Sequence, residues 1–333
     1  MELTTFWFIA IAVLFTGYFV LEGFDFGVGA LLPVLGRDER ERRVVINTIG
    51  PVWDGNEVWV IAAGGAMFAA FPEWYATLFS GFYLPLLLIL VALIVRGVAF
   101  EYRGKRDDPR WRARWDRAIV FGSLVPAVLW GVAFANIVRG VPVDAAGEYV
   151  GNLVDLLHPY ALLGGLTTLA LFVTHGAVFL ALKTRGDIRV RANRLARRLG
   201  PPTAVTAVVF LGWTMVEVSA GAAAVALAGA AALALLAGLA ANRVRREGWA
   251  FTGTAVAIGL VVVALFAALF PNVLPSSLDP AYSLTTANAS STPYTLRIMT
   301  WVALVFLPLV MGYQAWSYWV FRKRIDVSQI PKG

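Results

Sequence analysis

Two pairs of carboxylates stand inside strongly apolar stretches of the sequence. Glu22 and Asp25 lie in LEGFDFGVG, and Asp54 and Glu57 lie in GPVWDGNEVW. In a helix, a spacing of three residues puts both members of a pair on one face. Ionisable groups within membrane helices are costly and often form proton pathways. The pairs therefore predict a site of proton transfer, with helix capping, ion pairing and complementation of the helix dipole as structural alternatives.

A single arginine interrupts the third apolar stretch. Arg96 lies in VRGVAFEYR, and an arginine within the membrane almost always has an acidic partner. At a rise of about 1.5 Å per residue, the carboxylates at a compatible depth are those of Asp25, Asp54 and Glu57, and Glu101 is a local competitor. We therefore expect Arg96 to serve mainly as a structural ion-pair partner.

The sequence offers few ligands for a metal or a haem. It has no cysteine and only two histidines. His158 and His175 are 17 residues apart, which corresponds to about 25 Å along a helix, so they cannot bind one iron from the same helix. His158 precedes Pro159 and predicts a helix start, whereas His175 predicts a hydrogen-bonded packing residue. Without an HExxH sequence or a phosphate-binding glycine loop, this chain is expected to bind no metal or cofactor of its own.

The composition excludes a soluble protein. Hydrophobic residues make up 59% of the 333 residues and charged residues only 15%, whereas soluble domains usually have about 25% charged residues. The apolar runs predict an all-α, polytopic membrane helix bundle in a single integral-membrane domain, residues 1–333. The run from 203 to 241 is divided at Glu217–Gly221, because one helix of that length would overshoot the bilayer about twofold. The nine predicted transmembrane helices are 5–35, 51–71, 75–100, 118–138, 159–182, 203–219, 221–241, 249–270 and 297–321.

The basic residues predict how the bundle is oriented. Alternate loops on the C-terminal side hold 25 of the 28 Lys and Arg residues, and the loops on the other side hold only Arg139 and Arg297. Because basic loops remain in the cytoplasm, we expect the N-terminus outside and the C-terminus in the cytoplasm. This asymmetry accounts for the formal charge of +7, so it gives no reason to expect nucleic acid as a partner. Asp25 and Asp54 then lie at one depth in the cytoplasmic half.

Several longer motifs carry a family resemblance, in order along nearly the whole chain. They are GFDFGVG, the stretch from Glu41 to Trp59 that contains WDGN, FSGFYLPLLLIL from Phe79, EYR at 101–103, GVAFAN at 131–136, LFPNVLPSS at 269–277 and MTWVAL at 299–304. Together these motifs resemble subunit II of the cytochrome bd-type quinol oxidases.

The resemblance implies a multi-pass subunit of a bacterial cell-membrane oxidase that oxidises quinol and reduces O2 to water, taking protons from the cytoplasm. It also implies that two b-type haems, one d-type haem and the quinol-oxidising loop belong to subunit I, and that quinone binds in or near that partner. Small accessory subunits and membrane lipid are further expected partners. Asp25 and Asp54 match acidic positions of the family, Asp54 one assigned to the proton path, and Trp59 matches a tryptophan beside the proposed oxygen channel.

Two features depart from the family pattern. The hairpin near Glu217 is shorter than in long members, and Glu57 stands where some members have glutamine, which adds a carboxylate near Asp54. No loop between apolar runs exceeds 26 residues, too few to bury about 800 Å² against a partner. We therefore expect the interface with subunit I inside the membrane, with the GxxxG of Gly23 and Gly27 and the apolar faces of the first three helices as candidates.

Two other functions remain open at this stage. One is a structural scaffold that is needed only for assembly and haem retention in the partner. The other is a secondary transporter that uses the acidic pairs as coupling-ion sites. A transporter would require helices broken by glycine or proline near the bilayer midplane in both halves of the chain, and the sequence does not favour this pattern.

Overall fold

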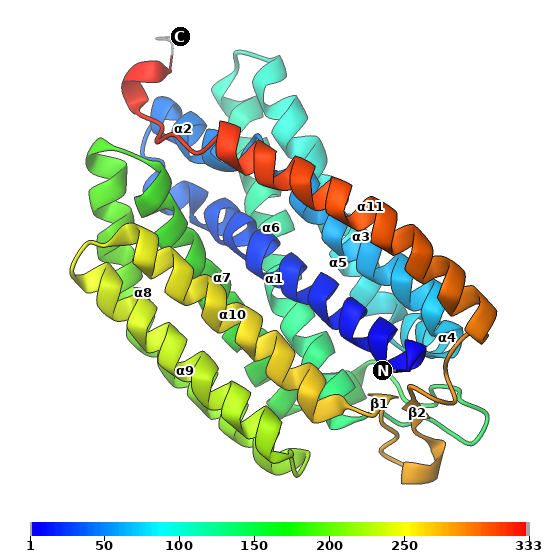
Figure 1. Ribbon diagram of the computed structural model, residues 1–333. Helices are drawn as coiled ribbons and strands as arrows, with labels where there is room; N and C mark the ends of the chain where they lie inside the picture. Colours follow the sequence, from blue (N-terminus) through cyan, green and yellow to red (C-terminus); the bar gives the residue numbers. More distant parts are fainter. Residues whose placement is uncertain (1, 331–333) are drawn as a thin grey trace.

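Long helices make up most of the molecule. The computed structural model describes residues 2–330 and has, within them, eleven α-helices and one two-stranded antiparallel sheet (Figure 1). The first and last described residues lie at opposite ends of the bundle. The elements are α1 (Leu3–Leu35), α2 (Glu39–Ile49), α3 (Trp53–Ala70), α4 (Pro72–Gly81), α5 (Tyr83–Tyr102), α6 (Pro109–Arg139), α7 (Pro159–Lys183), α8 (Gly186–Glu217), α9 (Ala222–Arg243), α10 (Glu247–Leu269), β1 (Asn272–Leu274), β2 (Leu284–Thr285) and α11 (Pro293–Val320).

Eight helices of the described chain are long and apolar enough to cross a membrane. They are α1, α5, α6, α7, α8, α9, α10 and α11. Nine spans were predicted. The remaining one, expected at 51–71, forms the helix α3, but α3 is not apolar enough to be counted because its first turns carry Asp54, Asn56 and Glu57. The all-α membrane bundle is confirmed, and its orientation across the membrane stays a prediction.

One expected helix is interrupted. The prediction of a single helix over 75–100 is wrong, because α4 ends at Gly81 and α5 begins at Tyr83, with Phe82 in a non-helical conformation between them. Pro85 explains the break: it has no N–H to donate to the carbonyl of Gly81, and its ring crowds that carbonyl.

The basic segments expected as loops are largely helical. The helix predicted at 203–219 begins at Gly186, and α2 and the start of α6 also lie in segments expected to be irregular. Arginine favours helices, and these segments need not be apolar where they leave the membrane. The helix of α8 continues through Pro201 and Pro202. The predicted division of the long apolar run is confirmed, since α8 ends at Glu217 and α9 starts at Ala222.

Helix α1 lies at the centre and packs closely against α7. An added Cβ atom at Gly27 would lie 2.0 Å from the carbonyl oxygen of Phe172 and 2.8 Å from the Cα atom of Gly176. At Gly23 it would lie 2.7 Å from the ring of Phe172. The GxxxG pattern therefore does allow a close approach, but the approaching helix belongs to the same chain. The expectation that Gly23 and Gly27 face a partner is wrong.

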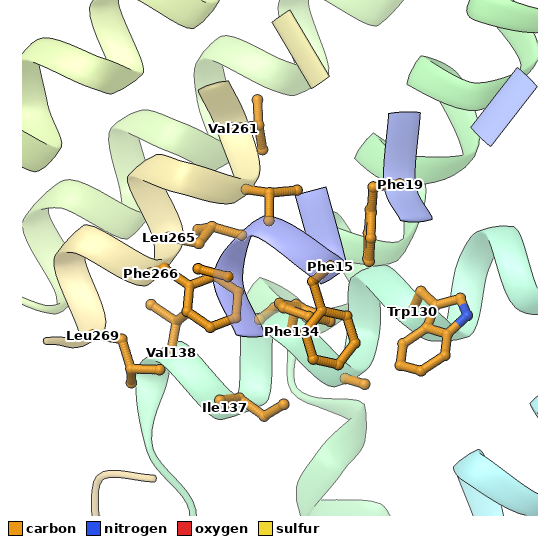
Figure 2. Packing of buried hydrophobic residues seen from close by; sticks show 14 of the residues in the cluster. Phe15, Phe19, Trp130, Phe134, Ile137, Val138, Val261, Leu265, Phe266 and Leu269 are labelled. Atoms are coloured by element: carbon orange, nitrogen blue, oxygen red, sulfur yellow. The ribbon is translucent and has the colours of Figure 1, made fainter. Parts of the chain in front are cut away.

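Aromatic rings fill the space between α1, α6 and α10 (Figure 2). Phe15 and Phe19 of α1 each lie edge-on to Phe134 of α6, with 5.0 Å between ring centroids. Phe266 of α10 is stacked with Phe15 at 6.1 Å. Such pairs add about 0.5–1.5 kcal/mol each to the effect of burial. The void left among these rings is only about 20 Å³, so side chains occupy this part of the core.

The two ends of the bundle differ in character. At the end near the N-terminus, the segment after α10 packs over the helices, with Val273 and Leu274 fully buried and Val141 N–H donating to the carbonyl of Pro275 at 3.1 Å. At the other end, Arg103 binds Glu39 through two hydrogen bonds of 2.9 and 2.8 Å. Burial raises the pKa of Glu39, but the hydrogen bonds and charge of Arg103 outweigh burial and hold this pKa below its ordinary value.

The contact between α1 and α7 gives a prediction. Replacing Gly27 by leucine forces two helix backbones apart, and overpacking of a core generally costs about 1–3 kcal/mol even where side chains can adjust. We expect Gly27→Leu to abolish or strongly reduce the yield of folded protein, measured by size-exclusion chromatography in detergent. The matched control is Gly229→Leu in α9, where an added Cβ would meet nothing within 4 Å. Equal yields of the two variants would contradict this account of the packing.

Candidate intramembrane polar site

Arg96 forms ion pairs with two carboxylates on neighbouring helices. Its side chain, on α5, is fully buried. Nη2 donates a hydrogen bond to Oε1 of Glu22 on α1 and another, of 2.7 Å, to Oε1 of Glu57 on α3. Glu22 is also fully buried, and Glu57 is four-fifths buried. The guanidinium lies 4.6 Å from the ring centroid of Phe26, an arrangement that favours a cation.

A close approach of helices positions this arginine. An added Cβ at Gly122 of α6 would lie 2.5 Å from the carbonyl oxygen of Ala92 and 2.5 Å from Cβ of Arg96. Only glycine allows α6 to lie this close to α5, and the side chain of Arg96 then extends among α1, α3 and α5. Glu22 lies on α1 and Glu57 on α3. Because α1 and α3 pack against each other, both carboxylates reach the guanidinium.

A second polar group is centred on Asn56, one residue before Glu57. Its Nδ2 donates a hydrogen bond of 2.7 Å to Oδ2 of Asp25, which is fully buried. Its Oδ1 accepts a hydrogen bond of 2.8 Å from Tyr318 and one of 3.3 Å from Gln314. Asn56 therefore links the carboxylate on α1 to the last helix, α11.

Trp59 lies about one turn after Asn56 on α3 and belongs to the same polar group. Its Nε1 donates a hydrogen bond of 2.8 Å to Oε1 of Gln314. Its ring lies flat against α1 at Gly17, where an added Cβ would come within 2.1 Å of the six-membered ring. Trp59 thus lies half-buried between α1 and α11.

Asp54 lies apart from these contacts. Its side chain is exposed, and Oδ1 accepts a hydrogen bond of 2.8 Å from the N–H of Gly55. Nothing in the described chain lies within 4 Å of a Cβ added at Gly55, Gly64 or Gly65 of the same helix. Asp54 is therefore on a face of α3 that the rest of this chain does not cover.

The structure thus divides the six predicted residues among three environments. Glu22, Glu57 and Arg96 form one ion-paired group, Asp25 and Trp59 belong to the group around Asn56, and Asp54 is on the open face. The sequence analysis gave no role to Asn56 and missed Gln314 and Tyr318. Their signal was the spacing of four residues between Gln314 and Tyr318, which puts two polar side chains on one face of an apolar helix.

The two histidines take part in capping and packing contacts. His158 is the N-cap of α7, and its Nδ1 accepts a hydrogen bond of 3.3 Å from the N–H of Tyr160. His175 is fully buried, with Nδ1 hydrogen-bonded to Thr254 at 2.7 Å and its ring stacked 4.7 Å from that of Phe251. Residues 2–330 also hold no group of three or more His, Asp or Glu residues suited to a metal ion.

Comparison with known proteins relates the whole chain to one family. A family model described as "Cytochrome bd terminal oxidase subunit II" matches residues 3–321. The chain is 45% identical to cytochrome bd ubiquinol oxidase subunit 2 of Bacillus subtilis, over 96% of each chain. It is 36% identical to cytochrome bd-I ubiquinol oxidase subunit 2 of Escherichia coli K12, over 98% of this chain and 96% of the relative. A chain in the structure of bd oxidase from Geobacillus thermodenitrificans has the same fold, with a TM-score of 0.79 at 17% identity over 96% of this chain and 99% of that one.

The buried ion pairs give a second prediction. Removing one partner of a buried pair usually costs about 3–5 kcal/mol, because a charge remains without compensation. We expect Arg96→Met to lower the free energy of unfolding by about this amount, measured by SDS-induced unfolding in mixed micelles. Adding Glu22→Gln and Glu57→Gln to the same chain should recover part of the loss, since no buried charge is then left.

The control is Arg112→Met, which breaks an ion pair with Asp107, a residue with 90% of its side chain exposed, and a longer one of 3.6 Å with Glu39, whose side chain is one-third exposed and keeps its bonds to Arg103. Exposed pairs contribute about 0–1 kcal/mol, so this variant should remain near wild type. A loss from Arg96→Met no larger than that from Arg112→Met would refute a stabilising role for the buried pairs.

Proposed function

The chain belongs to the family of cytochrome bd terminal oxidase subunit II, and we propose for this reason that it is the subunit without haem in a bacterial quinol oxidase. In this proposal it lies in the cell membrane with its N-terminus outside, and nine helices, α3 included, cross the bilayer. It packs against the haem-bearing subunit I, in a complex that transfers electrons from quinol to O2. The haems and the bound quinone belong to that partner.

We propose that this chain contributes a route for protons. The observation that carries the proposal is the excess of buried carboxyls over cations at this site. Glu22 and Glu57 pair with the guanidinium of Arg96, and Asp25, on the next turn of α1, is bonded only to the neutral amide of Asn56. A buried group of this composition avoids a net charge only when carboxyls also carry protons. It can therefore bind and release protons within an otherwise apolar bundle, as O2 reduction in the partner requires.

Asp54 is the proposed link between this group and the partner. It lies in the first turn of α3, two residues from Asn56, and points away from its own chain. An exposed carboxylate at this depth is costly against lipid, so a polar site on another subunit accounts better for its position. Protons would pass between the cytoplasm, Asp54 and the carboxyls of Asp25 and Glu57. We propose that Trp59, one turn further along α3, borders the route of O2.

The face formed by α3, α5 and α11 is the proposed interface with subunit I. Helix α11 is 28 residues long, yet only 6% of the residues in its most apolar stretch are buried by the rest of the chain. Gly64 and Gly65 on α3 have open space above them. Small residues allow helices of two proteins to approach closely within a membrane. These glycines, rather than Gly23 and Gly27, are therefore suited to the contact.

A structural scaffold is the second candidate function. The ion pairs of Arg96 favour this function, because they join α1, α3 and α5 with residues of this chain alone. If the polar residues serve only this purpose, their conservative substitution should affect assembly and haem retention in the partner and should not lower turnover separately.

The third prediction separates the two functions at Asp54. In the assembled complex, Asp54→Asn should leave the haem spectrum intact and reduce quinol-driven O2 consumption at least about tenfold, because asparagine cannot carry the proton. Asparagine keeps an oxygen that can accept the hydrogen bond from the N–H of Gly55, as aspartate does, so a purely structural residue would tolerate the change.

Two further variants serve as references in the same assay. Asp107→Asn changes an exposed carboxylate and should leave turnover unaltered, and Trp59→Phe should change mainly the affinity for O2. Near-normal turnover of a fully assembled Asp54→Asn complex would rule out the proton relay, whereas loss of haem together with activity would favour the scaffold.

The fourth prediction tests the interface. Gly65→Leu should leave this chain folded, since nothing in it lies near that position, and should greatly reduce co-purification of a tagged subunit I. Gly229→Leu, on α9 and also in open space, is the control and should retain the partner. Full retention of the partner by Gly65→Leu would place the interface elsewhere.

A further inference from the structure

A groove runs between α8 and α9 at the basic end of the bundle, on helices that take no part in the polar site. Its volume is about 260 Å³. Arg197, within α8, and Arg243, the last residue of α9, border its basic side. Apolar residues such as Ala204, Leu236 and Ala240 line it further into the bundle. From Arg243 to Leu236 the groove extends over seven residues, or about 10 Å of helix. It therefore has a cationic mouth and an apolar floor.

Buried amides hold the two helices in register at this point. Nδ2 of Asn193 donates hydrogen bonds to Oδ1 of Asn242 at 2.7 Å and to its carbonyl oxygen at 3.1 Å. Nη2 of Arg197 donates one of 2.5 Å to the carbonyl oxygen of Arg243, in the last turn of α9. The guanidinium of Arg197 is thus held beside the backbone of Arg243 by the protein itself, before any ligand binds.

The charge around the groove is uncompensated. Six arginines, in this part of α8, at the end of α9 and in the turn that follows it, form no ion pair with a carboxylate of the described chain. The nearby Glu247 is engaged by Arg189 at 2.7 Å and by Arg324 at 3.7 Å. The six are Arg194, Arg197, Arg198, Arg243, Arg245 and Arg246.

We propose that this groove binds an anionic phospholipid. The phosphate lies between the guanidinium groups of Arg197 and Arg243, and an acyl chain follows the apolar floor past Ala204 and Leu236. A basic pocket between membrane helices is suited to an anionic head group, and the groove adds an apolar path that a soluble anion would not use. Arginines whose only role is to keep the basic loops in the cytoplasm do not require a groove between the helices that carry them. The groove therefore favours a binding role for Arg197 and Arg243. The inference uses the fold of α8 and α9 alone and is independent of the proposed oxidase function.

Native mass spectrometry of the assembled complex after detergent exchange tests the proposal, with phosphatidylglycerol and phosphatidylcholine as probes. The wild-type complex should retain phosphatidylglycerol in preference to phosphatidylcholine. Arg197→Gln with Arg243→Gln should weaken phosphatidylglycerol binding about thirtyfold, because each arginine near the membrane surface contributes about a five- to sixfold gain in affinity for anionic lipid and the two factors multiply. Ala240→Phe, which fills the groove and keeps every charge, should also reduce retention.

The matched control is Arg245→Gln with Arg246→Gln, which removes the same charge outside the groove lining and should retain the lipid. Thermal stability with and without phosphatidylglycerol provides a second readout that does not depend on activity. Equal loss from both double variants would reduce the effect to general surface charge and overturn the proposal. So would unchanged retention in Ala240→Phe, equal retention of phosphatidylcholine by the wild type, or equal stabilisation by inorganic phosphate.

Discussion

Arg96 places a positive charge inside an apolar bundle, where an ion without a partner costs several kcal/mol. Glu22 and Glu57 supply the compensating charge from two other helices. The rotation of α1, α3 and α5 about their axes is therefore constrained at this depth: turning any one of them away would leave a buried charge unpaired. Most other contacts of these helices are apolar and tolerate small rotations better, so this group of charges determines how they face one another.

The remaining polar contacts depend on that arrangement. With Glu57 turned toward Arg96, the preceding residue Asn56 faces Asp25 and the polar side of α11. Helix α11 is otherwise sparsely covered by its own chain, and near its start it is held by Trp7, whose Nε1 donates to the carbonyl of Leu296 at 3.2 Å. Two small sets of hydrogen bonds therefore hold a long helix in place and leave most of its apolar surface open to another molecule.

Residues of one type serve different purposes in this fold. Gly27 lets two helices of the same chain touch, whereas Gly65 lies under open space. Arg96 is buried between acids, Arg103 joins Glu39 at the end of the bundle, and Arg197 borders a groove without an acidic partner. The same side chain thus stabilises the interior, the surface of the bundle, or a contact with a ligand, according to what its neighbours supply.

The sequence was sufficient for those features that depend on nearby residues. Length and hydropathy predicted the membrane bundle and the division between Glu217 and Ala222. A spacing of three residues predicted a shared helix face for each acidic pair, and Glu22 and Asp25 are both buried, whereas Asp54 is exposed and Glu57 is mostly buried against Arg96. The small number of histidines, and their separation, already argued against a haem site. Some local features were still missed, since Pro85 interrupts the helix at Phe82 and the basic start of α8 is helical.

Contacts between helices required the tertiary structure. Depth alone offered Asp25, Asp54 and Glu57 as partners for Arg96; of these only Glu57 pairs with it, and the other observed partner, Glu22, was missed. Depth also gave no sign that Gly27 meets Gly176 or that Asn56 meets α11. Each of these contacts depends on which helices are neighbours and how each is rotated about its axis. Which helices are neighbours, and how each is rotated, follow from packing among segments far apart in the chain. The hydropathy of a single segment carries almost no information about either.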